Sequence, residues 1–231
     1  MLGGEILVTD LELMEIQADV LFKKDNLGRI TEINEPICKS APLFFLGRTK
    51  VDNVLRFNES FPGTIINEVT QIVNQNPTNV DIGKIVIILN KVKAISKIWI
   101  GPAYVFPENF NMISNAIKIT SANKILLQSG FPNLLKQFEW RQPLFAVIED
   151  GTAVSVCCSA RISKKAAEAS VETLEAYQGK GYGRECVIAW AREVQKKGRH
   201  SLYSTAWDNF PSEAIAKKLN LYKYGIDFHI S

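Results

Sequence analysis

The chain is poor in the residues that build metal sites and disulfide frameworks. Its 231 residues include only two histidines, His200 and His229, and four cysteines. Two histidines are too few for a histidine-rich metal site, and the cysteine spacing matches no zinc pattern. So few thiols do not indicate a disulfide framework. We therefore expect no metal cofactor, and reduced thiols in a cytoplasmic protein, at Cys38, Cys157, Cys158 and Cys186.

Long apolar runs and strongly charged stretches are also missing. No run of 18 apolar residues occurs, and the start Met1-Leu-Gly-Gly-Glu5 lacks the pattern of a secretory signal. We therefore expect no membrane partner. Lys and Arg number 11 against 13 Asp and Glu in residues 1–115, and 16 against 11 in residues 116–231. This mildly basic second half suits an anionic small molecule, but it lacks the dense basic stripe of a nucleic-acid-binding protein.

What is present is ordinary for a globular chain, with 46% apolar and 22% charged residues. The length suffices for one large domain or two small ones. The polar segment 107–115 reads as a linker. We therefore predict a smaller N-terminal α+β domain over residues 1–115 and a second domain over residues 116–231.

The first half predicts short strands mixed with helices. Asp10 is a candidate helix cap. Residues 81–92 fit either an amphipathic helix or a buried strand, and we favour the helix. The other expected elements are a hairpin over 20–33, strands over 42–47 and 53–57, a helix over 64–73, and a strand over 97–100 ended by Gly101-Pro102.

The second half is more regular. Glu149-Asp-Gly151 predicts a tight hairpin turn. Because Cys157 and Cys158 are neighbours in one expected strand, only one of them should face the core. Strands are predicted over 116–120, 144–148, 152–158, 168–174, 201–206 and 222–230, and helices over 121–127, 132–140, from the glycine loop to 197, and from Asp208 or Asn209 to 220.

The segment Gln178-Gly-Lys-Gly-Tyr-Gly183 lies directly between an expected strand and an expected helix. Its glycines let the backbone approach a ligand closely. The free N–H groups of the first helical turn, together with the helix dipole, favour a phosphate group. Lys180 and Arg184 add positive charge. The spacing is neither a P-loop nor a dinucleotide fingerprint, and the alternative interpretation is a glycine-rich turn with solvated charges.

Residues 116–231 contain three features, namely Gln178-x-x-Gly181-x-Gly183, the preceding Val171-Glu-Thr-Leu174, and a helix opened by Asn209, that together resemble the GNAT superfamily of N-acyltransferases. Gln178-x-x-Gly181-x-Gly183 is similar to that family's Q/R-x-x-G-x-G/A loop. Val171-Glu-Thr-Leu174 precedes it, and Asn209 opens a helix that ends at Lys217-Lys-Leu-Asn-Leu221. The resemblance implies a mixed, mostly antiparallel sheet flanked by helices, in an α+β fold. The run Glu168 to Asn209 further resembles a two-domain subgroup with an additional N-terminal domain.

The resemblance implies acetyl-CoA as the acyl donor and assigns residues to it. The loop would hold the pyrophosphate and the strand before it the pantetheine arm. Asn209 would contact the pantetheine end, or serve only as a helix cap. The implied coenzyme-binding residues are Val171, Thr173, Leu174, Gln178, Gly179, Lys180, Gly181, Tyr182, Gly183, Arg184 and Asn209.

The implied reaction is direct attack by a primary amine, with a carboxylate on the strand as the base and a main-chain N–H steadying the developing oxyanion. The candidate bases are Glu172 and Glu168, which face the same side because they are four apart. Each is otherwise a solvated or ion-paired carboxylate. At the family's usual tyrosine position stands Ala216. The alternatives for protonating the thiolate are Tyr203, Ser204 or Tyr224, or unaided departure.

Two functions stay open. One is an N-acetyltransferase acting on a small-molecule or protein amine, with a homodimer also allowed. The other is a catalytically inactive acyl-CoA-binding sensor or interaction module. A cysteine-based two-step mechanism is disfavoured, because a buried strand cysteine is usually inert. The N-terminal domain is expected to cover the acceptor side, where Trp99, Tyr104 and Phe106 either line a cleft or belong to the core.

Overall fold

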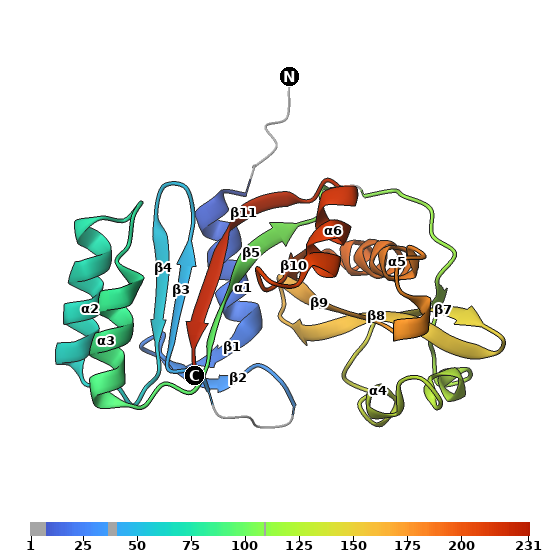
Figure 1. Ribbon diagram of the computed structural model, residues 1–231, viewed down its shortest axis with the longest axis horizontal. Coiled ribbons are helices and arrows are strands. Elements are labelled where there is room, and N and C mark those ends of the chain that lie inside the picture. The colour runs from blue at the N-terminus through green and yellow to red at the C-terminus, as the bar shows by residue number, and fades with distance from the viewer. Residues whose placement is uncertain (1–7, 37–40, 109) are drawn as a thin grey trace, which may run out of the picture. The chain divides into compact units, whose positions relative to one another are not determined.

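The computed structural model describes residues 8–36, 41–108 and 110–231 (Figure 1). By its internal contacts the chain forms two compact units. The first unit contains the described residues up to Ile33, residues 41 to Ala103, and Tyr224–Ser231. The second unit contains residues 34–36 and the described residues of Tyr104–Lys223. Both units draw on separate stretches of the chain. The domain boundary between residues 115 and 116 therefore stays a prediction about independent folding.

Helix α1 (Asp10–Leu21) opens the first unit with a capping box. The Thr9 hydroxyl accepts a hydrogen bond from Glu12 N at 3.2 Å, and the Glu12 carboxylate accepts one from Thr9 N at 2.8 Å. Thr9 is thus the cap, and the prediction of Asp10 was wrong by one position. The helix runs directly into β1 (Phe22–Lys24), which pairs antiparallel with β2 (Ile30–Ile33). The predicted hairpin is present, but it begins later than Val20.

The sheet of the first unit has the strand order β4-β3-β11-β5. On one face, α2 and α3 enclose an apolar cluster that includes Phe44, Leu46 and Phe228 (Figure 1). Residues 81–92 are helical, as we favoured, and Asp81 caps that helix by accepting from Lys84 N at 3.0 Å. The elements are β3 (Phe44–Arg48), β4 (Asn53–Phe57), α2 (Gly63–Gln75), α3 (Ile82–Val92), β5 (Ile98–Val105) and β11 (Tyr222–Ile230).

Strand β5 does not stop at Gly101-Pro102, so the predicted strand end was wrong. A proline lacks the N–H group but keeps an extended φ, so it fits a strand position that does not donate to the ladder. The residues after it, 103–106, are apolar and buried, which favours continuing the strand.

The second unit has the strand order β10-β9-β8-β7-β6. Its ladders are antiparallel except the parallel pair β9/β10. The α+β fold with a mostly antiparallel sheet flanked by helices is thus confirmed. Its elements are β6 (Ile117–Lys118), η1 (Lys124–Leu127), α4 (Pro132–Lys136), β7 (Leu144–Glu149), β8 (Thr152–Ile162), β9 (Ala166–Thr173), η2 (Glu175–Tyr177), α5 (Tyr182–Lys196), β10 (His200–Ser204) and α6 (Phe210–Lys218).

The hairpin between β7 and β8 turns as its sequence predicts. Glu149 pairs with Thr152, and the two residues between them have positive φ, 47° at Asp150 and 74° at Gly151. Two successive residues with positive φ match the twist of the flanking strands, which explains the Asp-Gly pair.

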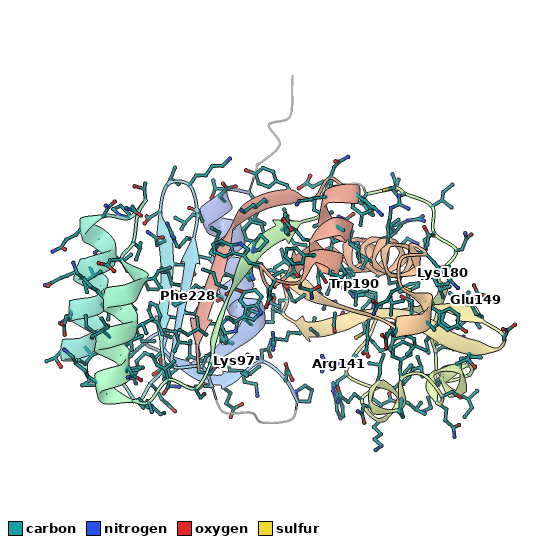
Figure 2. All side chains as sticks on the ribbon, in the orientation of Figure 1. Lys97, Arg141, Glu149, Lys180, Trp190 and Phe228 are labelled. Atoms are coloured by element: carbon teal, nitrogen blue, oxygen red, sulfur yellow. The ribbon has the colours of Figure 1, made fainter. Side chains whose placement is uncertain are left out.

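Helices cover both faces of this sheet (Figure 1). On one face, α5 places Trp190 against the strands, where its Nε1 donates to Ser159 Oγ at 3.1 Å (Figure 2). On the other face, η1 and α4 pack over a second apolar cluster. Cys157 belongs to the apolar cluster that contains Trp190, under α5, and Cys158 to the cluster under α4, so both are buried. The prediction that only one of them faces the core was wrong, because it assumed a sheet with one solvated face.

We expect Gly225→Ala to destabilise the first unit. A Cβ at Gly225 would lie 2.4 Å from the Arg48 carbonyl oxygen, a backbone atom that cannot move aside easily. Such overpacking costs about 1–3 kcal/mol and should lower the melting temperature by several degrees in scanning calorimetry. Gly63→Ala is the matched control, because nothing lies within 4 Å of its added Cβ. Equal melting temperatures for the two variants would contradict the crowding argument.

Candidate functional site

The site begins where two parallel strands separate. β10 pairs with β9 at three positions, and the last of these joins Leu202 to Glu168. Beyond it β9 continues to Thr173 while paired only with β8 on its other edge. One edge of β9 is therefore open over its final residues.

Along this open edge, the main-chain N–H and C=O groups of every second residue point into the opening. Leu174 N donates to Val154 O at 3.0 Å, toward β8. Because an antiparallel strand bonds the same neighbour at every second residue, the main-chain groups of Val171 and Thr173 point the other way, into the opening. The Thr173 carbonyl accepts a hydrogen bond from Gln178 Nε2 at 3.3 Å. This edge can thus donate and accept hydrogen bonds with an extended ligand.

The glycine loop borders the same opening. Gly179 and Gly181 have φ of 77° and 86°, in the left-handed region where a side chain is strained. Gly181 is the N-cap of α5, and no side chain caps that helix. The N–H groups of its first turn, from Tyr182 to Arg184, are therefore available to an anion, and the dipole of the 15-residue helix favours one.

A glycine is needed at position 183 for a different reason. A Cβ there would lie 3.2 Å from Thr173 Oγ1 and 3.3 Å from the Ile215 side chain. Its absence lets α5 approach β9 and α6 closely. The neighbouring Tyr182 hydroxyl donates to the Glu149 carboxylate, a hydrogen bond that raises the pKa of Tyr182.

A pocket of about 500 Å³ joins the open edge, the loop and α6. It brings together most of the residues predicted for the coenzyme. These are Val171, Thr173, Gln178, Gly179, Gly181, Tyr182, Gly183, Arg184 and Asn209, with the candidate base Glu172.

Leu174 and Lys180 were predicted for the coenzyme but do not line the pocket. Leu174 packs against the apolar cluster under α4, and Lys180 Nζ lies 4.8 Å from the centre of the Tyr177 ring. In place of Lys180, Lys218 lines the pocket as a second positively charged residue in addition to Arg184. The residues that the sequence reasoning missed are Tyr177, Pro211, Ser212, Ala214, Ile215 and Lys218. The last five lie on the helix predicted from Asp208 or Asn209 to 220, and the face of that helix was the available signal for them.

The two candidate bases have different surroundings. Glu172 is exposed and lines the pocket. Glu168 is only 4% exposed and does not line it. The Glu168 carboxylate instead accepts hydrogen bonds from Ser204 N at 2.8 Å and from Ser204 Oγ at 2.6 Å. Their positions on β9 put both side chains on one face of the strand.

None of the residues considered for protonating the thiolate lines the pocket. Ala216 is buried in the core under α5. The Tyr203 hydroxyl donates to the Ser212 carbonyl at 3.3 Å, and burial raises its pKa well above the usual value. Ser204 donates to Glu168, and the hydroxyl of Tyr224, in the first unit, donates to Gln17.

Asn209 has the capping role, and its contact with the pantetheine end stays a prediction. Its side-chain oxygen accepts from Ser212 N at 3.2 Å and so caps α6. It also lines the pocket, and any ligand contact would be made from this fixed orientation.

Within the described ranges, no three His, Cys, Asp or Glu side chains converge in a way that could hold a metal ion. Across the same residues, every helix is too short or too polar to cross a membrane.

Comparison with solved structures yields 31 matching chains. One is a GNAT-family protein from Novosphingobium aromaticivorans, with 10% identity and a TM-score of 0.50, matched over 59% of this chain and 65% of its own, just under two thirds. Another is a GNAT acetyltransferase from Colwellia psychrerythraea, with 9% identity and a TM-score of 0.48, over 77% and 76%. A third is yncA from Salmonella typhimurium, solved with acetyl-CoA, with 21% identity and a TM-score of 0.36, over 47% and 81%.

The first of these likenesses, with a TM-score of 0.50, shows a shared fold. The family model of the GNAT acetyltransferases matches residues 110–226, just over half of the chain. The chain therefore belongs to the GNAT acetyltransferase family, and acyl transfer is the class of reaction that this membership supports. No curated protein matches the sequence.

We expect three cysteines to resist alkylation in the native protein. Burial raises the pKa of Cys158 and Cys186 to about 12 and that of Cys157 well above its usual value, so almost no thiolate forms near neutral pH. Iodoacetamide treatment followed by peptide mass spectrometry should leave all three unmodified, and modify them once the protein is denatured. Rapid native labelling of Cys157 would reopen a cysteine-based mechanism.

Proposed function

We propose that this protein is an N-acetyltransferase that moves the acetyl group of acetyl-CoA to a primary amine. The observation that supports this most is the pocket itself. An open strand edge, a glycine loop and the uncapped start of a long helix meet around one cavity. This is the arrangement expected for a ligand with a diphosphate at one end and an extended, amide-containing arm.

The lining residues fit the donor in their chemistry. The loop and first-turn N–H groups suit the pyrophosphate, and Arg184 and Lys218 add positive charge to the pocket lining. The main-chain groups of Val171 and Thr173 suit the pantetheine amides, and Asn209, at the start of α6, also lines the pocket. The left-handed glycines leave the loop free of side chains where the phosphates would approach.

When bound, acetyl-CoA supplies a thioester carbonyl, to which the acceptor nitrogen forms a bond as the carbon–sulfur bond breaks and the thiolate leaves. A primary amine is mostly protonated near neutral pH, so it first loses one proton to water to become a nucleophile, and a base must take the second proton from the nitrogen as the amide forms. Glu172 is the carboxylate that lines the pocket, and we assign it this role, acting directly or through a water molecule. No protein group is assigned to protonate the thiolate, whose modest pKa allows it to leave unaided.

The acceptor in this proposal is a small-molecule or protein amine, and the cytoplasm and a homodimer stay predictions. A catalytically inactive acyl-CoA-binding module is the second candidate. The observation in its favour is that Ala216, at the usual tyrosine position, is buried and that Tyr203, Ser204 and Tyr224 all lie outside the pocket. Acetyl-CoA binding without coenzyme A release on a panel of amines would select this second candidate.

We expect Gly181→Val to weaken acetyl-CoA binding by about tenfold or more, measured by titration calorimetry. A β-branched side chain at a φ of 86° strains the loop and covers its N–H groups. Gly151→Val is the matched control, because Gly151 also has a positive φ and open space around it but lies in the β7–β8 turn. If the wild type has no affinity, or both variants bind like it, the proposed phosphate cradle is wrong.

We expect Glu172→Gln to lower kcat by about 10²–10⁴-fold while leaving acetyl-CoA affinity nearly unchanged. The amide keeps the shape of the side chain but cannot take up the proton. The measurement is coenzyme A release with an amine acceptor, followed across pH. Glu175→Gln is the control, since this exposed carboxylate in η2 does not line the pocket. Equal kcat values for the two variants would exclude Glu172 as the base.

A further inference from the structure

The end of the β9/β10 pairing leaves a donor that needs a partner. The register of the two strands pairs Leu202 with Glu168, so a continuing ladder would bring Ser204 opposite Ser170. The Ser204 N–H group does not follow that ladder. It donates to the Glu168 side chain at 2.8 Å, two residues back along β9.

Glu168 therefore takes the place of a main-chain acceptor. Its Oε1 atom receives both the N–H and the hydroxyl of Ser204, and the second bond is 2.6 Å long. Hydrogen bonds to a carboxylate are shorter and stronger than those between neutral groups. They satisfy a main-chain donor that the divergence of the strands would otherwise leave without a partner in the ladder.

The same contacts argue against Glu168 as the base. A base must reach the amine in the pocket, and Glu168 is 4% exposed and outside the lining. Glu172, four residues along the same face, is exposed and inside it. One carboxylate thus faces the ligand space while the other is directed to the end of β10.

We propose that Glu168 is a positioning residue that holds the end of β10 to β9 through Ser204 and so fixes where the two strands part. The opening that follows is where the pantetheine arm of acetyl-CoA binds, and in this respect the inference rests on the proposed function. The carboxylate determines the width of that opening without touching the reacting atoms.

The test compares two substitutions at this one position. Glu168→Gln keeps an oxygen that accepts both Ser204 hydrogen bonds, so acetyl-CoA affinity and kcat should stay within about threefold of the wild type, with the same pH profile. Glu168→Ala removes the acceptor, so acetyl-CoA affinity should fall by about tenfold or more. Ser170→Ala, on the same face of β9 and outside the pocket lining, is the control and should leave affinity unchanged.

Amide hydrogen exchange by NMR gives a readout that needs neither substrate nor turnover. The Ser204 N–H should be protected in the wild type and in Glu168→Gln, although the ladder has ended at Leu202. Fast exchange of this amide in the wild type would overturn the inference, and it would do so even if Glu168→Ala failed to fold.

Two further outcomes would overturn it. A loss in kcat of about 100-fold or more in Glu168→Gln, with acetyl-CoA affinity intact, would make Glu168 the base. Unchanged acetyl-CoA affinity in a folded Glu168→Ala variant would show that the contact with Ser204 does not shape the opening. The absence of any acetyl-CoA affinity in the wild type would be the distinct failure, that of the proposed function.

Discussion

A parallel pair of strands that stops pairing partway leaves hydrogen-bonding groups inside the fold that need other partners. The rest of the site depends on this constraint. On β9 the groups of Val171 and Thr173 turn toward a pocket, where water or a ligand can satisfy them. On β10 the Ser204 N–H is satisfied by a carboxylate. The binding edge and the buried contact are thus two consequences of one divergence between strands.

The glycine loop completes the site, and its three glycines are needed for two different reasons. Gly179 and Gly181 supply a left-handed backbone in open space, which turns the chain so that N–H groups line the cavity. Gly183 has an ordinary φ, and what it supplies is room between α5, β9 and α6. A larger residue would therefore act on loop conformation at the first two positions and on helix packing at the third.

Local patterns predicted most of the fold. The cap at Thr9 instead of Asp10 was a local error, but the errors that concern the core and the site lie where distant residues decide. The Asp-Gly turn, the amphipathic period of α5 and the loop before it were readable because each depends on neighbours in sequence. The burial of both Cys157 and Cys158 was not, since it requires α4 and α5 to cover opposite faces of one sheet. Lys218 could not be identified from the loop motif either, because only the packing of α6 brings it to the pocket wall.

The pair Glu168 and Glu172 shows most directly where sequence reasoning stops. Both are glutamates, both lie on β9 and both point to the same face. The alternation of side chains along the strand therefore cannot decide which of them is the base. What separates them is the path of β10, which begins more than 25 residues later and ends beside the first of them. The two side chains are chemically identical, but they differ in hydrogen-bond partners and in burial. Glu168 is held by its hydrogen bonds with Ser204, whereas Glu172 faces the cavity. The two hydrogen bonds hold the Glu168 carboxylate beside the end of β10 and outside the pocket lining, whereas Glu172 lies in that lining, where an amine could reach it.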